Sequence, residues 1–238
     1  MGKKNVLVIG TGTIGEPLIG LLSDFQDEFN INVFFHKRTP LIDEYAKVES
    51  LCKRGAKLVV DIDKWDNFLQ LRHKPNFNFE QALQIANIVI DCTPVGNNNK
   101  EKNYLPIIES EKSFGCGKRK KVFIAQGSEK GFGLPYAYGI NDKALKRDES
   151  QFIQVVSCNT HNICGLLKSL SPDLDTIIDS DFVCVRRAND ISQNGSFIAS
   201  PQVGGHDTAR YGTHHAHDAS RVLDTLFTKV KMYSSAMK

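Results

Sequence analysis

The side chains best suited to covalent chemistry stand at 157–160, which reads Ser-Cys-Asn-Thr. These residues follow an apolar run, so Cys158 is expected at the junction between a strand and the start of a helix. A helix N-terminus favours the reactive thiolate form of a cysteine. Ser157, Asn159 and Thr160 surround the thiol with polar groups, and those of Asn159 and Thr160 can hold an oxyanion. The pattern predicts a nucleophilic cysteine, whereas the alternative for any cysteine is a buried structural residue.

Two cationic clusters follow the cysteine. Arg186 and Arg187 end a predicted strand, and adjacent arginines suit an anionic substrate such as a phosphate ester. The stretch 213–218 reads Thr-His-His-Ala-His-Asp, with three histidines in four positions. Zinc is the alternative use of these histidines. No cysteine stands near them and the helical H-x3-H spacing is missing, so we expect no metal.

A glycine-rich turn stands near the start of the chain. Gly10, Gly12 and Gly15 form a G-x-G-x-x-G between the apolar run 6–9 and helical spacing over 16–25. Gly10 permits a tight turn, Gly12 lets a pyrophosphate approach the backbone, and Gly15 lets helix and strand pack closely. Phosphates would bind the N–H groups at the helix N-terminus. The pattern predicts a dinucleotide site, and the alternative is a turn that binds nothing.

The second strand ends in His36, Lys37, Arg38 and Thr39, about twenty residues after the last glycine. An NAD-preferring site usually carries an acid there, which binds the ribose 2′-hydroxyl. Cationic side chains at this point suit a 2′-phosphate, so the sequence favours NADP over NAD. The alternative is a solvated basic loop.

Two polar turns follow other buried strands. They are 91–96, which contains Thr93 and Pro94, and 126–128, which contains Gly127. Both stand at the carboxyl ends of predicted parallel strands, where ligands bind in open α/β sheets. We therefore expect both turns to line the cofactor site. The role of Cys92 in the first turn stays open.

The elements that must position these residues alternate along the chain. Strands are expected at 6–9, 31–35, 57–60, 88–91 and 122–125, and helices at 16–25 and 43–54. This order predicts an α/β fold with a Rossmann-type, doubly wound parallel sheet. A charged stretch at 141–150 suggests a boundary between a dinucleotide-binding domain, 1–140, and an abbreviated α+β catalytic domain, 141–238. The second domain is expected to hold strands at 152–156 and 182–187, a helix at 165–170, a loop over 194–218, and a helix beginning at 220.

Composition narrows the classes of function. The chain has 238 residues, 41% hydrophobic and 24% charged, with a net charge of +3. These values fit a globular protein and give no support to nucleic-acid binding. The basic cluster 118–121 is interpreted as a solvated loop. No apolar run approaches the ~20 residues of a membrane helix. The first strand begins at once and no cysteines form a CxxC pair, so we expect a cytoplasmic protein with reduced thiols.

Seven motifs together resemble the archaeal type of glyceraldehyde-3-phosphate dehydrogenase, across nearly the whole chain. The family carries G-x-G-T-[IV]-G, a basic Lys/Arg/Pro turn, D-[AC]-T-P-x-G, Q-G-G-E-K, V-V-S-C-N-T, [VI]-R-R-[AG] and S-H-H-G-P-D. Similar residues stand here, in the same order, at 10–15, 36–40, 91–96, 126–130, 155–160, 185–188 and 213–218.

The resemblance implies a homotetrameric enzyme that oxidises glyceraldehyde 3-phosphate with NAD(P) and inorganic phosphate. Cys158 would be the nucleophile, with Ser157, Asn159 and Thr160 beside the substrate. The dinucleotide would contact residues of the glycine-rich turn, the basic turn and the later loops: Gly10, Gly12, Thr13, Ile14, Gly15, Lys37, Arg38, Thr93, Pro94, Gly127 and Arg187. The phosphorylated substrate would contact Arg186, His214 and His215.

The chain departs from the family pattern after Cys158, where extra residues stand at the start of the helix, and it is expected to end before family members do. The family's further part would carry more strands, a histidine that activates the cysteine, and a segment that packs on the cofactor domain. We therefore expect cofactor binding with weak or no oxidation of substrate, and His215 as the replacement base. The alternatives are a semialdehyde or acyl-phosphate reductase, and a non-catalytic dinucleotide-binding fragment.

Overall fold

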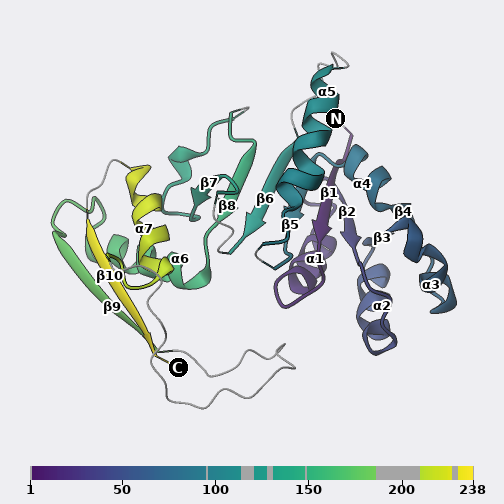
Figure 1. Cartoon of the computed structure of the whole chain (residues 1–238), viewed down its shortest axis with the longest axis horizontal. Helices are drawn as coiled ribbons and strands as arrows, with labels where there is room; N and C mark the ends of the chain where they lie inside the picture. Colours follow the sequence, from purple (N-terminus) through teal and green to yellow (C-terminus); the bar gives the residue numbers. More distant parts are fainter. Residues whose placement is uncertain are drawn as a thin grey trace. The chain divides into compact units, whose positions relative to one another are not determined.

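The computed structural model describes residues 2–94, 96–113, 121–127, 131–147, 149–185, 210–226 and 230–237. The chain forms two compact units, Met1–Ala125 and Gln126–Lys238, drawn in Figure 1. The expected division into functional domains near residue 140 stays a prediction.

The first unit is built on parallel strands. They are β1 (Lys4–Ile9), β2 (Ile31–His36), β3 (Lys57–Val60), β4 (Phe77–Asn78), β5 (Ile88–Asp91) and β6 (Val122–Gln126), whose last residue begins the second unit. Their order across the sheet is β4-β3-β2-β1-β5-β6, and every pairing is parallel. The chain order reverses between β1 and β5, which is the switch point where such sheets bind ligands. The predicted α/β, Rossmann-type fold is confirmed.

Helices connect the strands. They are α1 (Gly15–Asp24), α2 (Tyr45–Lys53), α3 (Trp65–Gln70), α4 (Phe79–Ile85) and α5 (Leu105–Ser113). Two short 3₁₀ turns, η1 (Ile42–Glu44) and η2 (Ile62–Lys64), precede α2 and α3, and a π-helical segment, η3 (Lys100–Tyr104), precedes α5. The helix predicted over 43–54 is thus divided into η1 and α2. The start of α4 is fixed by a capping box, in which Asn78 and Gln81 bond each other's backbone N–H groups.

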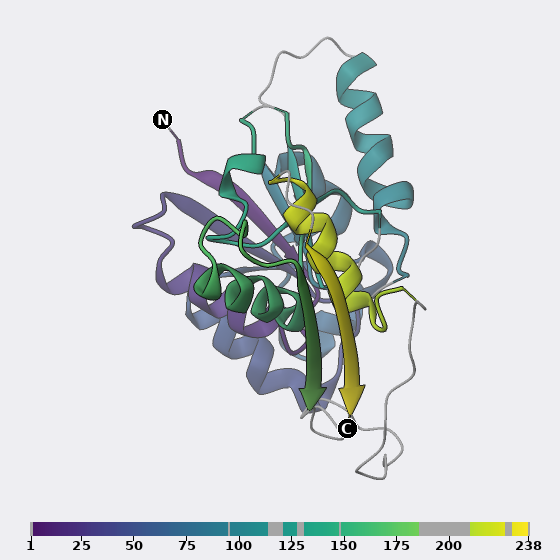
Figure 2. The same cartoon turned by 90° about the vertical axis from the view of Figure 1, so that its left-hand side faces the viewer.

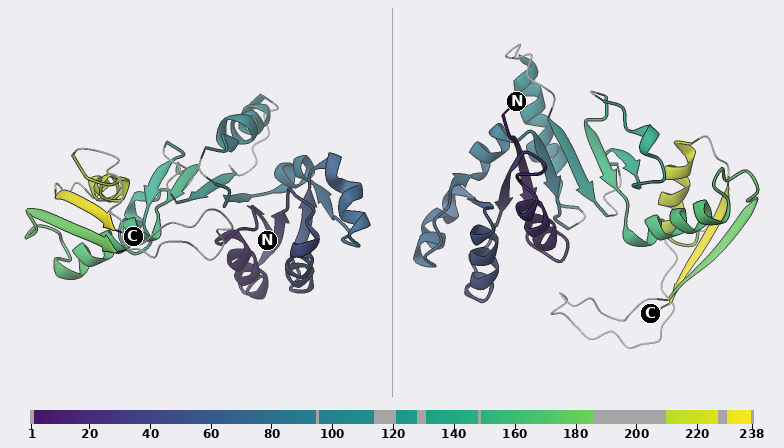
Figure 3. Two further views of the ribbon diagram at one scale, coloured as in Figure 1. Left: turned by 60° about the horizontal axis from the view of Figure 1, so that its bottom comes forward. Right: turned by 180° about the vertical axis from the view of Figure 1, so that it is seen from behind.

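Both faces of this sheet are covered, which explains why its strands are almost continuously apolar. Val6 and Val8 of β1 share one core cluster with Ile19 of α1 and Leu51 of α2. Figure 3 shows α1 and α2 together on that face. Because side chains alternate along a strand, Leu7 points to the opposite face, and α4 packs there against β1 and β3. No helix in the described part of the chain is long and apolar enough to cross a membrane.

The second unit contains two pairs of parallel strands and two helices. β7 (Leu134–Tyr136) pairs with β8 (Phe152–Val155), and β9 (Asp179–Val185) pairs with β10 (Lys231–Met237). A short turn, η4 (Asp142–Ala144), follows β7. Helices α6 (Cys158–Leu170) and α7 (His214–Asp224) pack against each other, and Figure 2 shows β9 and β10 side by side.

Helix α6 begins at Cys158, where a junction between strand and helix was predicted, because Ser157 caps it, and the segment predicted as helix, 165–170, is its C-terminal part. The prediction for α7 is wrong about where the helix begins. The segment His214–Asp224 is helical from its first residue, although its first half was predicted as loop and the helix was expected from 220. Ala216, Ala219 and Leu223 form a buried stripe at helical spacing on α7. The polar histidines between these apolar residues made the helical spacing difficult to recognise in the sequence.

Candidate active site

The glycine-rich turn has the geometry that its spacing predicts. Gly10 has φ +95° and its N–H donates to the carbonyl of His36 at 3.3 Å. A Cβ on Gly15 would lie 2.0 Å from the carbonyl oxygen of Gly10, so only glycine lets α1 pack this closely on the end of β1. A Cβ on Gly12 would meet no heavy atom within 4 Å. Gly15 therefore allows the close packing of α1 on β1, and Gly12 leaves the outer face of the turn open to a ligand.

The structure brings two of the predicted site turns together at the switch point. A Cβ on Gly10 would lie 3.2 Å from the carbonyl oxygen of Cys92 and 3.4 Å from the methyl group of Thr93. Thr13 and Ile14 are exposed just before α1, and Pro94 is exposed after β5. Thr13 and Ile14 thus lie at the N-terminus of α1, and Cys92 and Thr93 lie close to Gly10 beside it.

The turn after β5 is held by a buried carboxylate. Asp91 Oδ1 accepts hydrogen bonds from the N–H and the hydroxyl of Thr93, at 2.9 and 2.5 Å. Its Oδ2 accepts from Asn99 Nδ2 at 2.8 Å and from the hydroxyl of Tyr104 at 2.6 Å. Burial next to this carboxylate raises the pKa of Tyr104, so the phenol stays a donor. Sequence reasoning missed Asn99 and Tyr104, whose partner lies in an earlier segment.

The basic residues after β2 have partners of their own. His36 Nε2 lies 3.0 Å from Asp61 Oδ1, and its ring packs on Phe79. The ammonium group of Lys37 forms an ion pair with Glu44 and is largely buried. Arg38 is exposed. A 2′-phosphate placed here would therefore meet Arg38 directly and Lys37 only in competition with Glu44.

Lys47 connects this region to the glycine-rich turn, a role that the sequence did not reveal. Its Nζ donates to the carbonyl of Thr11 at 3.3 Å and to Glu44 Oε1 at 2.7 Å, and it lies 3.4 Å from Glu16 Oε2. Partial burial by itself lowers the pKa of Lys47, but the hydrogen bond to Glu44 raises it above the usual value. The ammonium group therefore stays charged and ties α2 to the turn.

In the second unit, the predicted nucleophile stands at the start of a helix. Cys158 is the first residue of α6 and is exposed. Ser157 is the N-cap, and its Oγ accepts a hydrogen bond from the N–H of Thr160 at 3.3 Å. The thiol thus lies at the N-terminus of α6, beside the N–H groups of the first helical turn.

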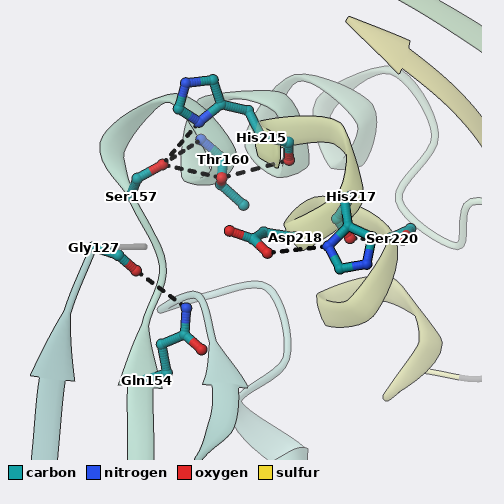
Figure 4. Close-up of polar contacts among 8 residues, drawn as sticks. All are labelled: Gly127, Gln154, Ser157, Thr160, His215, His217, Asp218 and Ser220. Carbon is teal, nitrogen blue, oxygen red and sulfur yellow. Dashed lines mark hydrogen bonds and ion pairs between the residues drawn. The ribbon is translucent and has the colours of Figure 1, made fainter. Parts of the chain in front are cut away.

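The ring of His215, which is buried, contacts both neighbours of the cysteine. Its Nδ1 lies 3.2 Å from Ser157 Oγ, and its Nε2 lies 3.2 Å from Asn159 Nδ2. One arrangement of protons satisfies these contacts, in which Asn159 donates to Nε2 and Nδ1–H donates to Ser157. Ser157 then donates to Thr160 Oγ1 at 3.0 Å, and Thr160 donates to the carbonyl of His215 at 3.4 Å. Figure 4 shows Ser157, Thr160 and His215 in this network.

His214 and Asp218 complete this part of α7. The ring of His214 is partly exposed and lies 3.9 Å, centroid to centroid, from that of His215. Asp218 is buried, and its Oδ1 lies 3.4 Å from His217 Nδ1. Nearby, the amide of buried Gln154 donates to the carbonyl of Gly127 at 3.1 Å (Figure 4).

Two predicted site residues, Arg186 and Arg187, lie outside the described residues. Among those that the structure does describe, no group of three His, Cys, Asp or Glu side chains is arranged to hold a metal ion.

The cysteines differ in burial, and burial makes a thiol harder to ionise. Desolvation raises the pKa of Cys52 to about 11 and those of Cys92 and Cys164 to about 12. Cys158 is exposed. Cys92, whose role the sequence left open, therefore acts as a packing residue of the β5 turn.

The chain is similar in sequence to archaeal glyceraldehyde-3-phosphate dehydrogenases. The enzyme of that name from Pyrobaculum islandicum is 27% identical over 218 residues, which are 91% of this chain and 58% of the relative. The Methanobacterium bryantii enzyme is 31% identical over 80% of this chain and 52% of its own length. For the Methanobrevibacter smithii enzyme, the identity is 26% over 93% of this chain and 60% of the relative. No family model matches the chain.

The chain thus spans little more than half the length of these glyceraldehyde-3-phosphate dehydrogenases. The similarity extends over both units, because it covers up to 93% of this chain. It supports a likeness to this group of dehydrogenases as a whole.

Proposed function

We propose that this chain provides the dinucleotide site and the nucleophile of a dehydrogenase of the archaeal glyceraldehyde-3-phosphate dehydrogenase type. The observation that carries the proposal is the position of Cys158, exposed at the first residue of α6, with Ser157 and Asn159 on either side bonded to one buried histidine. The proposed substrates are glyceraldehyde 3-phosphate and inorganic phosphate, and the proposed product is 1,3-bisphosphoglycerate.

The glycine-rich turn of the first unit would hold the cofactor. Gly12 leaves room for a pyrophosphate, and Thr13 and Ile14 present the N-terminus of α1, so the residues fit a dinucleotide. Lys37 and Arg38 stand where the ribose would lie, and we propose NADP as the preferred form over NAD. We assign further contacts to Gly10, Gly15, Thr93, Pro94, Gly127 and Arg187. The bound nicotinamide supplies the hydride acceptor.

Cys158 performs the covalent step. Its thiolate attacks the aldehyde carbon, so that an S–C bond forms and the carbonyl oxygen gains negative charge. Loss of a hydride from the former aldehyde carbon, for which the nicotinamide would be the acceptor, re-forms the carbonyl group and leaves a thioester on Cys158. Inorganic phosphate then attacks the thioester carbon, the S–C bond breaks, and the acyl phosphate leaves with the thiolate restored.

His215 positions the groups around the thiol. Because its ring holds both Ser157 and Asn159, these side chains keep fixed directions beside the reacting carbon. Asn159 and Thr160 are proposed to contact the developing oxyanion. His214, His215 and Arg186 are proposed to bind the substrate phosphate, and His215 is the proposed base.

We propose a homotetramer in the cytoplasm and a functional division into domains 1–140 and 141–238. A reductase that acts on semialdehydes or acyl phosphates has the same cysteine chemistry and is distinguished by its substrate.

A burst experiment tests the reaction. The 238-residue chain is mixed with glyceraldehyde 3-phosphate and NADP without phosphate, and NADPH absorbance is recorded. We expect at most one equivalent of NADPH per chain, because the thioester accumulates, followed by only slow formation of further NADPH once phosphate is added. Cys158→Ser should form none, and Cys164→Ser is the matched control. Reduction by the serine variant, or a burst only with semialdehydes, would contradict the proposal.

A further inference from the structure

Four charged side chains form a cluster between the glycine-rich turn and the end of β2. Glu44 is at its centre: one carboxylate oxygen pairs with Lys37, and the other accepts from Lys47 at 2.7 Å. Lys47 in turn lies 3.4 Å from Glu16. We call these four residues, Glu16, Lys37, Glu44 and Lys47, the Glu44 cluster. All of them belong to the first unit, and Lys47 also bonds the carbonyl of Thr11 in the turn.

The cluster occupies the place that decides between two forms of a dinucleotide. Lys37 is the first residue after β2, where an acid usually binds the ribose 2′-hydroxyl and a cation accommodates a 2′-phosphate. This chain places an acid and a cation at the same point, because Glu44, the last residue of η1, forms an ion pair with Lys37. Neither group acts alone, because the carboxylate partly neutralises the ammonium group.

Glu44 is charged in this setting. Its burial by itself raises the pKa of the carboxyl group, but hydrogen bonds from Lys37 and Lys47 lower the pKa below the usual value. A 2′-phosphate that binds Lys37 must therefore displace the Glu44 carboxylate and remain next to it. The two negative charges then repel each other.

We infer that Glu44 sets the cofactor preference by competing with a 2′-phosphate for Lys37. In this arrangement Glu44 lowers the affinity for NADP without lowering that for NAD, because the ribose of NAD carries no 2′-phosphate to compete for Lys37. The inference rests on the proposed dinucleotide site. It extends the proposal from the cations of the basic turn to an acid from the following segment.

Binding measurements on the full chain test this role. Affinities for NADP and NAD are measured by titration calorimetry for the wild type, Glu44→Gln and Asp43→Asn. Asp43 is exposed and adjacent in η1, so its variant removes the same charge next to the contact. We expect Glu44→Gln to raise the affinity for NADP relative to NAD about tenfold, the value of one charge-assisted hydrogen bond. Asp43→Asn should leave the ratio within about twofold of the wild type.

Two further measurements separate competition from a loss of structure. In a Lys37→Met background, Glu44→Gln should no longer change the ratio, because the group under competition is gone. Higher salt should reduce the effect of Glu44→Gln, since screening weakens the contrast between charges. Thermal unfolding of each variant shows that the first unit is folded.

The outcomes distinguish the inference from the function on which it rests. If the wild type binds both dinucleotides but Glu44→Gln and Asp43→Asn have equal ratios, the inference is wrong and the proposed site stands. If the wild type binds neither NADP nor NAD, both are wrong. An effect of Glu44→Gln that persists in the Lys37→Met background also overturns competition for Lys37.

Discussion

A methyl group added to Gly15 should lower the stability of the fold, whereas one added to Gly12 should lower only the affinity for a dinucleotide. On Gly15, the new Cβ would lie 2.0 Å from the carbonyl oxygen of Gly10, 2.9 Å from its carbon and 3.3 Å from Cys92 Cβ. The first two atoms are backbone and cannot rotate away, so α1 must move from β1. Overpacking of this kind costs about 1–3 kcal/mol or more in free energy of unfolding.

At Gly12 the same methyl group meets no atom within 4 Å, and φ lies outside the left-handed region. The free energy of unfolding should therefore change by no more than about 0.5 kcal/mol. The methyl group would occupy the face that we propose for the pyrophosphate. We expect Gly12→Ala to lose dinucleotide affinity by about tenfold or more, at unchanged stability.

The single tryptophan makes this comparison specific to the first unit. Trp65 lies in α3 and packs against the core formed by β1, α1 and α2. Urea unfolding followed by its fluorescence gives the stability of each variant, and titration calorimetry gives the affinity for NADP. Equal stabilities of Gly12→Ala and Gly15→Ala, or wild-type binding by Gly12→Ala, would refute the reasoning.

Three further predictions concern reactivity, pH and capping. Iodoacetamide should label Cys158 before Cys92 and Cys164, whose burial raises their pKa to about 12, and mass spectrometry that finds Cys92 first would contradict this. Burial lowers the pKa of His73 below 6.5, so the unfolded chain binds more protons and stability should fall as pH drops below 6.5. His73→Phe should reduce this loss of stability at low pH, as measured by urea unfolding at several pH values. If the variant keeps the pH dependence of the wild type, His73 is not its cause. Ser157→Ala should lower stability by about 1 kcal/mol through the lost cap, as measured by circular dichroism, with Ser169→Ala as control.

The sequence alone was sufficient for the elements that local chemistry specifies. Residues 57–60 form β3 and residues 88–91 form β5, as the three successive apolar residues in each segment predict. The glycine spacing also located the turn before α1, because a strand that runs directly into a helix needs small residues at those positions. The junction at Cys158 was predicted on the same basis, from an apolar run followed by capping residues.

Other features depend on residues far apart in the chain. The basic cluster 118–121 was interpreted as a solvated loop, but Lys121 is buried and its Nζ donates to the carbonyls of Gln84 and Ala86, at 2.6 and 2.8 Å. For Lys121 the prediction is wrong, and 118–120 lie outside the described residues. The partners are carbonyl oxygens at the end of α4, which no local pattern marks as acceptors.

The environment of the candidate nucleophile was likewise decided by tertiary structure. Sequence spacing brought Ser157, Cys158 and Asn159 to one helix start, but only the packing of α7 on α6 places the ring of His215 against Ser157 and Asn159. The same holds for Glu44 and Lys37, because the sequence shows two charged residues but not that they form an ion pair. Periodicity and turn chemistry report the conformation of a few successive residues, whereas the partner of a side chain depends on which distant segments the fold brings together.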